Sequence, residues 1–352
     1  LQQNLPNTSV RDAAFKDNDL VVATYGRGFW VLDDISILRQ LGATVANEPA
    51  RLFKPGGAVR VRRNVGADTP FPPEVPHALN PPEGAIVDYW LAQAPSSDIT
   101  LDVLDAAGAV VRHLTSAPGK PVEEAARPPE PNFWIAPPFS LPKNAGENRT
   151  SWDLRYDAPS AFTHSFEINA NPGLTPASPL GPLVPPGTYT LKLTVDGKSY
   201  TQTVSVKADP RSPATLEALR AQHALQMKIV AGLEASYEGN RLAEALRDAV
   251  RAADPNAALV AALDSLAGAS AGRGRGRFGP PGPPNFRSIN GALVGQLNEQ
   301  ENGDRMPTAA AIAAYASVCA DLSKAAATWQ RLSTTELATV NAALKSRGGS
   351  PI

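Results

Sequence analysis

The sequence has very little cysteine and almost no net charge. Cys319 is the only cysteine among 352 residues, so no disulfide can form within the chain. The 33 lysines and arginines nearly balance the 34 aspartates and glutamates, which gives a formal net charge of −1. A chain without excess positive charge lacks the electrostatic footprint of a nucleic-acid-binding protein. We therefore expect no nucleic-acid partner.

Long hydrophobic runs and clustered histidines are also missing. No apolar stretch approaches the roughly 20 residues that a membrane-spanning helix requires, so we expect no membrane span. The histidines lie far apart and share no ligand spacing with the single cysteine. We therefore expect no cofactor, no metal site and no histidine-based catalytic triad. The four histidines are His77, His113, His164 and His223.

A strand pattern is present near the beginning of the chain. Residues 20–25 and 29–32 are aliphatic and aromatic runs, and Gly26-Arg27-Gly28 between them supplies the positive φ angles of a tight turn. Residues 10–15 form a further expected strand. An isolated hairpin is marginally stable in water. Either the rest of the chain covers these strands, or the chain is part of something larger.

Proline dominates the next segment, and short strands follow it. The many prolines between residues 42 and 84 remove amide donors, so this range is expected to be a linker with one strand near 58–62. From residue 85 the strands alternate with turn signals such as Asp196-Gly197, which predicts an immunoglobulin-like sandwich over residues 85–208. The expected strands are 85–91, 99–104, 110–114, 149–156, 188–195 and 198–206. Proline-rich insertions at 117–147 and 157–186 are expected to pack against the sandwich or a missing domain.

The last part of the chain has helical periodicity. Leucine, isoleucine and valine recur at steps of three and four residues, which predicts an antiparallel helical bundle over residues 209–352. Ser333-Thr334-Thr335-Glu336 has the chemistry of a capping box and is expected to begin the last helix. The expected helices are 215–253, 255–266, 288–300, 308–332 and 334–345. Residues 268–287 are expected to form a loop rich in glycine, proline and arginine.

Six segments carry a family resemblance. They are Val10-Arg11-Asp12, Asn18-Asp19-Leu20-Val21-Val22-Ala23-Thr24, Gly26-Arg27-Gly28-Phe29-Trp30-Val31-Leu32-Asp33-Asp34-Ile35-Ser36, Leu38-Arg39, Asn148-Arg149-Thr150-Ser151-Trp152-Asp153-Leu154-Arg155-Tyr156 and Pro185-Pro186-Gly187-Thr188-Tyr189-Thr190-Leu191. Together they resemble the C-terminal region of bacterial sortilin-like proteins with BNR/Asp-box β-propellers, often labelled glycosyl hydrolases. The resemblance implies a mixed fold: a β-propeller last-blade remnant at 1–41, an immunoglobulin-like β-sandwich, then a C-terminal α-helical bundle. It also implies an upstream propeller domain or chain as partner and a secreted or periplasmic location.

The resemblance favours a non-catalytic role. It implies domain scaffolding with carbohydrate or protein binding, and the alternative is a part of a glycoside hydrolase whose active site lies in an absent propeller. The Asp-box pattern Ser-x-Asp-x-Gly-x-x-Trp is not intact anywhere in this chain. A third hypothesis is a protein-interaction module built on the helices, which predicts an exposed apolar face on residues 308–332. No set of catalytic residues is expected.

Phe133 and Trp134 are the candidate ligand-binding residues. They lie in a proline-rich loop, where an exposed aromatic ring can stack on the apolar face of a sugar. Trp30, Trp90 and Trp152 lie within expected strands, where burial is the ordinary state.

Other motifs receive structural interpretations. Residues 268–272 match G-x-S-x-G and residues 274–279 match G-x-G-x-x-G, but neither follows a strand, so both are read as a flexible loop. Asp33 and Asp34 are expected to cap the turn at the end of a strand. Cys319 is expected to be a buried thiol in the apolar stripe of a helix, with Ile312, Tyr315 and Leu322.

Overall fold

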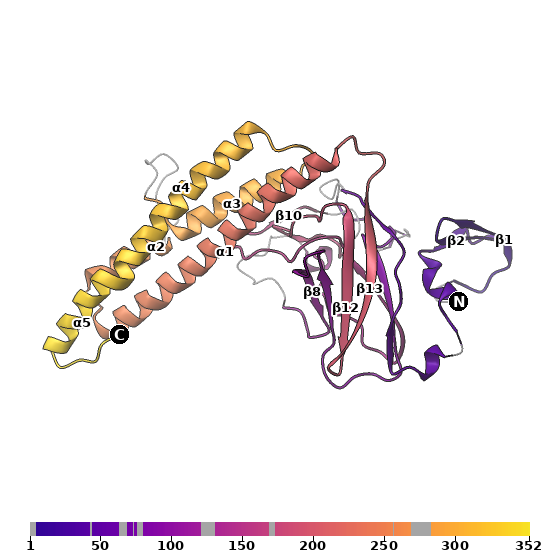
Figure 1. The fold of residues 1–352 in the computed structure, drawn as a ribbon, viewed down its shortest axis with the longest axis horizontal. Coiled ribbons are helices and arrows are strands. Elements are labelled where there is room, and N and C mark those ends of the chain that lie inside the picture. Colours follow the sequence, from indigo (N-terminus) through magenta and orange to yellow (C-terminus); the bar gives the residue numbers. More distant parts are fainter. Residues whose placement is uncertain are drawn as a thin grey trace.

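The computed structural model describes residues 5–42, 44–62, 69–72, 74–75, 80–120, 131–168, 173–255, 257–268 and 283–352. The chain forms a β-rich part followed by helices, as the expected mixed fold requires. Figure 1 shows three bodies in a row: a small N-terminal sheet, a sheet region, and an elongated helical region. None of the helices in the described ranges has both the length and the apolar character needed to cross a membrane.

The N-terminal sheet has three antiparallel strands in the order β1-β2-β3. These are β1 (Val10–Lys16), β2 (Asp19–Thr24) and β3 (Phe29–Leu32). Gly26 and Gly28 have φ angles of 73° and 70°, which confirms the glycine turn. The short helix η1 (Ile35–Arg39) then leads away, and its buried Ile37 packs in a small cluster with Val45 and Phe53.

The sheet region contains two sheets around one core. The five-stranded sheet has the order β5-β13-β12-β7-β8 and the three-stranded sheet the order β4-β6-β9. Alternate side chains of both sheets point into a common hydrophobic cluster that includes fully buried Tyr89, Trp152 and Leu191. The strands are β4 (Ala50–Leu52), β5 (Ala58–Arg60), β6 (Ala85–Leu91), β7 (Thr100–Leu104), β8 (Val110–Thr115), β9 (Gly146–Trp152), β12 (Gly187–Val195) and β13 (Lys198–Ala208).

Two of these strands come from the range expected to be a linker. β5 occupies the position expected near 58–62, but β4 was not expected, because three residues next to Pro49 carry no periodic signal. The pairing of β4 with β6 places Leu52 beside Tyr89. A further two-stranded sheet, β10 (Ser165–Phe166) with β11 (Ala177–Ser178), lies within the second proline-rich insertion.

The helical region runs up, down and up again. α1 (Leu216–Ala253) leads away from the sheets, α2 (Ala258–Ala267) and α3 (Phe286–Gln300) return, and α4 (Ala309–Arg331) and α5 (Leu337–Ser346) lead away again (Figure 1). Side chains of Thr215, Asn285 and Thr308 cap α1, α3 and α4.

The expected helix start at Ser333 is wrong. The π-helical turn η5 (Leu332–Glu336) joins α4 to α5 without a break. The Ser333 and Thr334 hydroxyls donate hydrogen bonds back to the Gln330 carbonyl. Since these side chains are satisfied within a continuous helix, they do not cap a new one.

The second proline-rich insertion packs on the helices. The Phe162 ring stacks on Tyr237 of α1 at 4.6 Å between centroids, and the Arg287 guanidinium lies 4.5 Å from the centre of the Phe162 ring. The Phe162 amide also donates to the Asn290 side chain at 3.1 Å. We expected this insertion to cover the sandwich or a missing domain. Its end does pack on the sheet region, where Leu183 and Val184 lie in the hydrophobic cluster, and the insertion also joins the sheet region to the helical region.

Candidate functional site

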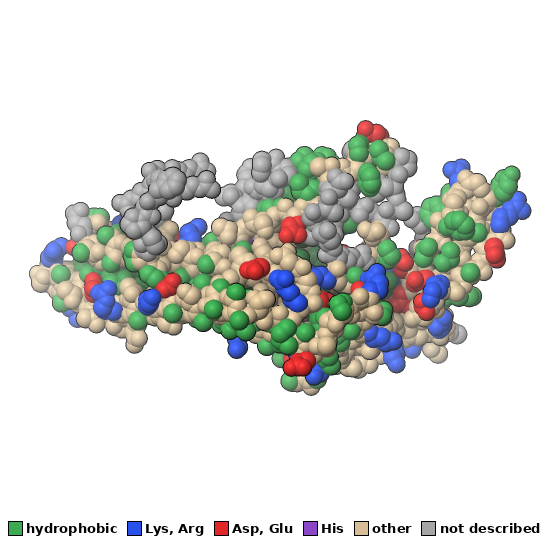
Figure 2. Space-filling view, turned by 90° about the horizontal axis from the view of Figure 1, so that it is seen from above, with side chains coloured by type: hydrophobic (Ala, Val, Ile, Leu, Met, Phe, Trp, Pro, Cys, Tyr) green, Lys and Arg blue, Asp and Glu red, His purple; other side chains and the backbone are tan. Residues whose placement is uncertain are grey.

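The N-terminal sheet is the most exposed apolar part of the described structure. All of β1 is exposed, and the side chains of Phe15 and Phe29 are 70% and 79% exposed. Figure 2 shows hydrophobic side chains on the surface at this end of the molecule, among charged ones. The rest of the described chain therefore does not cover the sheet.

Both faces of this sheet are apolar. The pairing places Phe15, Leu20 and Leu32 side by side on one face. On the opposite face, the same registers align Ala14, Val21 and Val31. None of these six side chains is buried. A sheet with two apolar faces is typical of a central layer, which is covered on both sides.

One arginine ties the N-terminal sheet to the sheet region. The Arg149 guanidinium donates to the backbone carbonyl oxygens of Asp33 and Asp34 at 2.6 and 2.9 Å. It also pairs with the Asp88 carboxylate at 2.7 Å. Burial raises the pKa of Asp88, although Arg149 opposes this shift. The tie thus fixes the direction in which the chain leaves β3.

Asp34 caps the turn that follows β3. Asp34 has a φ of 43°, and its carboxylate accepts from the amides of Ser36 at 3.0 Å and Gly56 at 3.2 Å. One oxygen of Asp34 therefore caps the turn and the other holds Gly56, which confirms the capping interpretation for Asp34. Burial, together with the charge of Asp19, raises the pKa of Asp33.

Phe133 and Trp134 lie in the short helix η4 (Asn132–Trp134). Their rings meet edge to face, with centroids 6.1 Å apart. The Phe133 side chain is 54% exposed and that of Trp134 is half-buried. The turn is held by backbone bonds between Thr175 and its neighbours Trp134 and Ala136, at 3.0 and 2.8 Å. A fixed turn with one open ring is geometrically suited to stack on a flat apolar ligand surface.

Burial was expected for Trp30, Trp90, Trp152 and Cys319, and only part of this expectation is confirmed. Trp152 is buried, and its indole donates to the Arg155 carbonyl at 2.9 Å. Trp30 and Trp90 are half-buried. The expected buried stripe around Cys319 is wrong, because Cys319 is half-buried and the Ile312 side chain is 52% exposed.

The described histidines stand apart from one another. His113 Nδ1 lies 2.6 Å from the Asp102 carboxylate on the surface of the five-stranded sheet. Burial, together with the Arg60 charge, lowers the pKa of His223 to about 4. Within the described ranges, no three histidine, cysteine or acidic side chains are grouped to hold a metal ion. His77 and residues 269–282, which include most of the two glycine motifs, lie outside those ranges.

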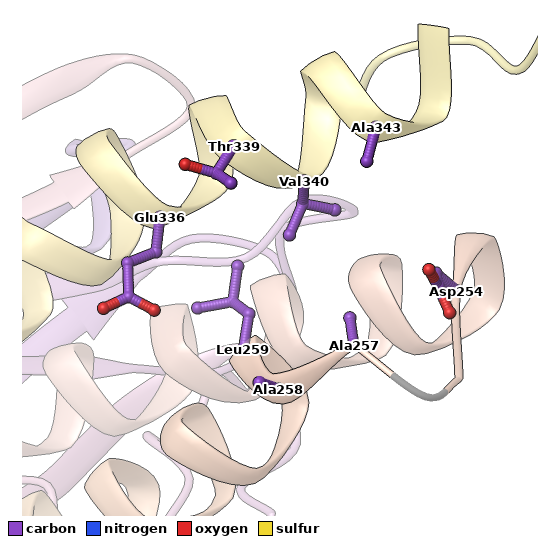
Figure 3. A pocket seen from close by; sticks show the side chains of 8 residues that line it. All are labelled: Asp254, Ala257, Ala258, Leu259, Glu336, Thr339, Val340 and Ala343. Carbon is purple, nitrogen blue, oxygen red and sulfur yellow. The ribbon is translucent and has the colours of Figure 1, made fainter. Parts of the chain in front are cut away.

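A hollow lies between the beginning of α2 and α5 (Figure 3). Leu259 and Val340 form its apolar wall, and Glu336 and Asp254 stand at its ends. The Asp254 carboxylate is paired with Arg347 at 3.0 Å, and Glu336 is paired with Arg331.

A buried polar cluster was not predicted from the sequence. Arg60, Arg62 and Arg155 of the sheet region meet Glu301 and Asp304 of the turn between α3 and α4. These residues are separated by up to 244 positions in sequence, so no local motif could indicate the cluster. It joins the sheets to the helices.

Comparison with known proteins gives no relative for this chain. No protein-family model, no curated protein and no solved structure matches it.

Proposed function

We propose that this chain is the non-catalytic C-terminal region of a secreted or periplasmic sortilin-like BNR propeller protein. Its role is domain scaffolding, together with carbohydrate or protein binding. The observation that carries the proposal is the N-terminal sheet, whose two apolar faces are both exposed. Such a sheet is incomplete as a folded unit and needs a covering partner.

The shape of the sheet indicates what kind of partner covers it. In a β-propeller, each blade is a small antiparallel sheet arranged radially beside two neighbouring blades. An inserted blade is therefore covered on both faces, which is what Phe15 on one face and Val31 on the other require. We infer that β1, β2 and β3 are the strands of a last blade.

The sheet region supports the second part of the proposal. Its two sheets share one core, and the strands are joined by tight turns such as Asp196-Gly197, where both residues have positive φ. These features favour an immunoglobulin-like sandwich. In this arrangement the Arg149 tie sets the angle between the blade and the sandwich.

A pair of matched substitutions tests the docking. Phe29→Asp and Val110→Asp each place a carboxylate at an exposed apolar position, the first on the N-terminal sheet and the second on β8. In this chain alone, both variants should change the free energy of unfolding by no more than about 0.5 kcal/mol. In the longer protein that includes the propeller, only Phe29→Asp should lower the melting temperature, because it buries an unpaired charge.

The outcomes that contradict the proposal are specific. If Phe29→Asp is as well tolerated as Val110→Asp in the longer protein, the sheet is not a buried blade. Turnover of polysaccharide by this chain alone would contradict the non-catalytic role.

A further inference from the structure

The sheet region and the helical region meet at a buried group of charges, which we call the arginine–carboxylate junction. It consists of Arg60, Arg62, Arg155, Glu301 and Asp304. Asp304 lies 2.6 Å from Arg60 and 2.8 Å from Arg62, while Glu301 lies 2.7 Å from Arg62 and 2.8 Å from Arg155. The side chains of Arg60 and Asp304 are only 2% and 9% exposed.

The two carboxylates come from one short turn and carry most of the polar bonds across the junction. Gln226 of α1 donates to Glu301 at 3.0 Å, and Gln222 donates to the carbonyl oxygens of Gln300 and Gly303 at 2.9 and 2.8 Å. These glutamines hold the turn on α1. With both acids ionised, three guanidinium groups face two carboxylates, so the junction already has one excess positive charge.

Further titratable groups face the junction from α1 and from the sheets. The His223 ring lies 5.2 Å from the Tyr156 ring, and burial, together with the Arg60 charge, lowers the pKa of His223 to about 4. Burial opposes ionisation of Asp304, but hydrogen bonds and charge from Arg60 and Arg62 hold its pKa below the ordinary value. Burial also raises the pKa of Tyr189 to about 12, so this phenol stays neutral.

Proton uptake in acid changes this balance. Protonation of His223 adds a positive charge beside Arg60, at a junction that already has one excess positive charge. The His223 ring of α1 lies 5.2 Å from the Tyr156 ring of the sheet region, so this new charge arises where the two regions meet. Acid therefore adds repulsion at the junction. Removal of one carboxylate would also weaken it, because losing one partner of a buried ion pair leaves the other charge uncompensated.

The tie to the N-terminal sheet is built differently. Arg149 reaches across that boundary to the backbone carbonyl oxygens of Asp33 and Asp34, which do not titrate. The acids that face Arg149 there are Asp88, Glu147, Asp34 and, near Asp33, Asp19. Burial raises the pKa values of Asp33, Asp88 and Glu147, so these acids take up protons in acid, whereas the bonds from Arg149 to the two backbone carbonyl oxygens remain.

We propose that the arginine–carboxylate junction is an acid-sensitive latch. In acid, the base of the helical region separates from the sheet region, while the N-terminal sheet stays attached through Arg149. The segment 157–168 keeps the two regions tethered, because the stacking of Phe162 on Tyr237 and its bond to Asn290 involve no titrating group. Glu234, which accepts from the Ser160 amide, is the acid on this tether.

The test measures two distances by paired spin labels in a Cys319→Ser background. One pair, Thr201→Cys with Ala327→Cys, spans the latch at exposed sites on β13 and α4. The reference pair, Thr201→Cys with Lys16→Cys, spans the tie to the N-terminal sheet. Between pH 7.5 and pH 4, the first distance should lengthen and broaden, and the second should stay constant.

The size of the effect follows from His223 alone. A pKa of 6.5 in the open form and of about 4 in the closed form reduces the ratio of closed to open molecules at pH 4 by about 30-fold, after allowance for partial exposure. Asp304→Asn should show the long distance already at pH 7.5. Asp254→Asn is the matched control, because it removes a carboxylate paired with Arg347 at the far end of the helices.

Three results would overturn the latch. The first is an unchanged latch distance at pH 4 while circular dichroism still reports helix. The second is an equal change in both label pairs, which indicates general unfolding. The third is an Asp304→Asn variant that behaves like the Asp254→Asn control. Should Asp304→Asn not fold, Glu301→Gln replaces it. The amide retains an acceptor, which favours folding, but it removes the negative charge that pairs with Arg62 and Arg155, so the same lengthening is expected.

Discussion

Single arginine side chains link the parts of this molecule. Arg149 holds the N-terminal sheet through two backbone carbonyls, whereas Arg60 and Arg62 hold the helical turn through carboxylates. The guanidinium group suits this role because it presents several donors in one plane and stays charged when buried. The backbone acceptors of Arg149 do not titrate, whereas Arg60 lies close enough to His223 for its charge to help lower the pKa of that ring.

Phe133 is the residue on which carbohydrate binding is predicted to depend. Phe133→Ala should weaken binding to an insoluble polysaccharide by about fivefold, because an aromatic stacking contact contributes about 1 kcal/mol. The stability of the chain should not change, since the ring is largely exposed. A pull-down assay with increasing amounts of polysaccharide measures the effect.

The matched control for this prediction is Phe139→Ala, which removes another exposed ring. Equal binding by wild type and Phe133→Ala, or an equal loss in both variants, would count against a specific site at the aromatic turn.

At the scale of elements, the helices differ in how closely they are packed. Gly239 of α1 faces the Phe286 ring, and an added Cβ would lie 2.6 Å from it. A Cβ added to Gly291 of α3 would have no atom within 4 Å. Close packing of α1 against α3 therefore requires glycine at position 239 of α1, whereas position 291 of α3 has room for a larger side chain.

The two glycines give opposite predictions for the same substitution. Gly239→Ala should destabilise the chain by about 1–3 kcal/mol through overpacking against Phe286. Gly291→Ala should stabilise it by about 0.5–1 kcal/mol, because alanine has the higher helix propensity. Urea unfolding of both variants measures the difference, and a similar effect of both substitutions would contradict this account of the α1–α3 contact.

Also at this scale, α4 matters for the hypothesis of a helical interaction module. Its outward side carries exposed Ile312 together with exposed Ala313, Ala316 and Ala320. This exposed apolar face lies within residues 308–332, where the hypothesis places it. The hypothesis itself remains a prediction.

At the scale of the whole molecule, stability should depend on pH through His223. Its folded pKa of about 4 lies below the unfolded value of 6.5, so the unfolded chain binds more protons between these values. The free energy of unfolding should therefore fall as the pH decreases from 6.5 to 4, by about 2 kcal/mol from this residue after allowance for partial exposure.

The variant His223→Phe isolates this contribution. It keeps a ring beside Tyr156 but cannot take up a proton, so its unfolding free energy should depend less on pH in that window. The raised pKa values of Asp88 and Asp157 act in the opposite direction, but they are the same in both proteins. Parallel curves of stability against pH for wild type and variant would contradict the role of His223.

Most of the elements could be predicted from the sequence, whereas the contacts between them could not. The turns at Gly26 and Gly28 and at Asp196-Gly197 could be predicted because these residues readily adopt positive φ angles. The helices could be predicted from the spacing of leucines. β4 and the continuous turn η5 were missed, because pairing and helix continuation decide them rather than local signals. Phe133 was selected correctly as an exposed ring, but Ile312 was wrongly placed in a buried stripe.

The sequence by itself determined that the chain is mixed, with strands first and helices last, because hydrophobic periodicity and turn residues are local properties. It also determined the hairpin of the N-terminal sheet, since aliphatic and aromatic runs flank a turn with two glycines. Only the tertiary structure decided that neither face is covered and that three arginines meet two carboxylates between sheets and helices. Those facts depend on residues far apart in the chain, and their proximity arises only when the separate cores assemble.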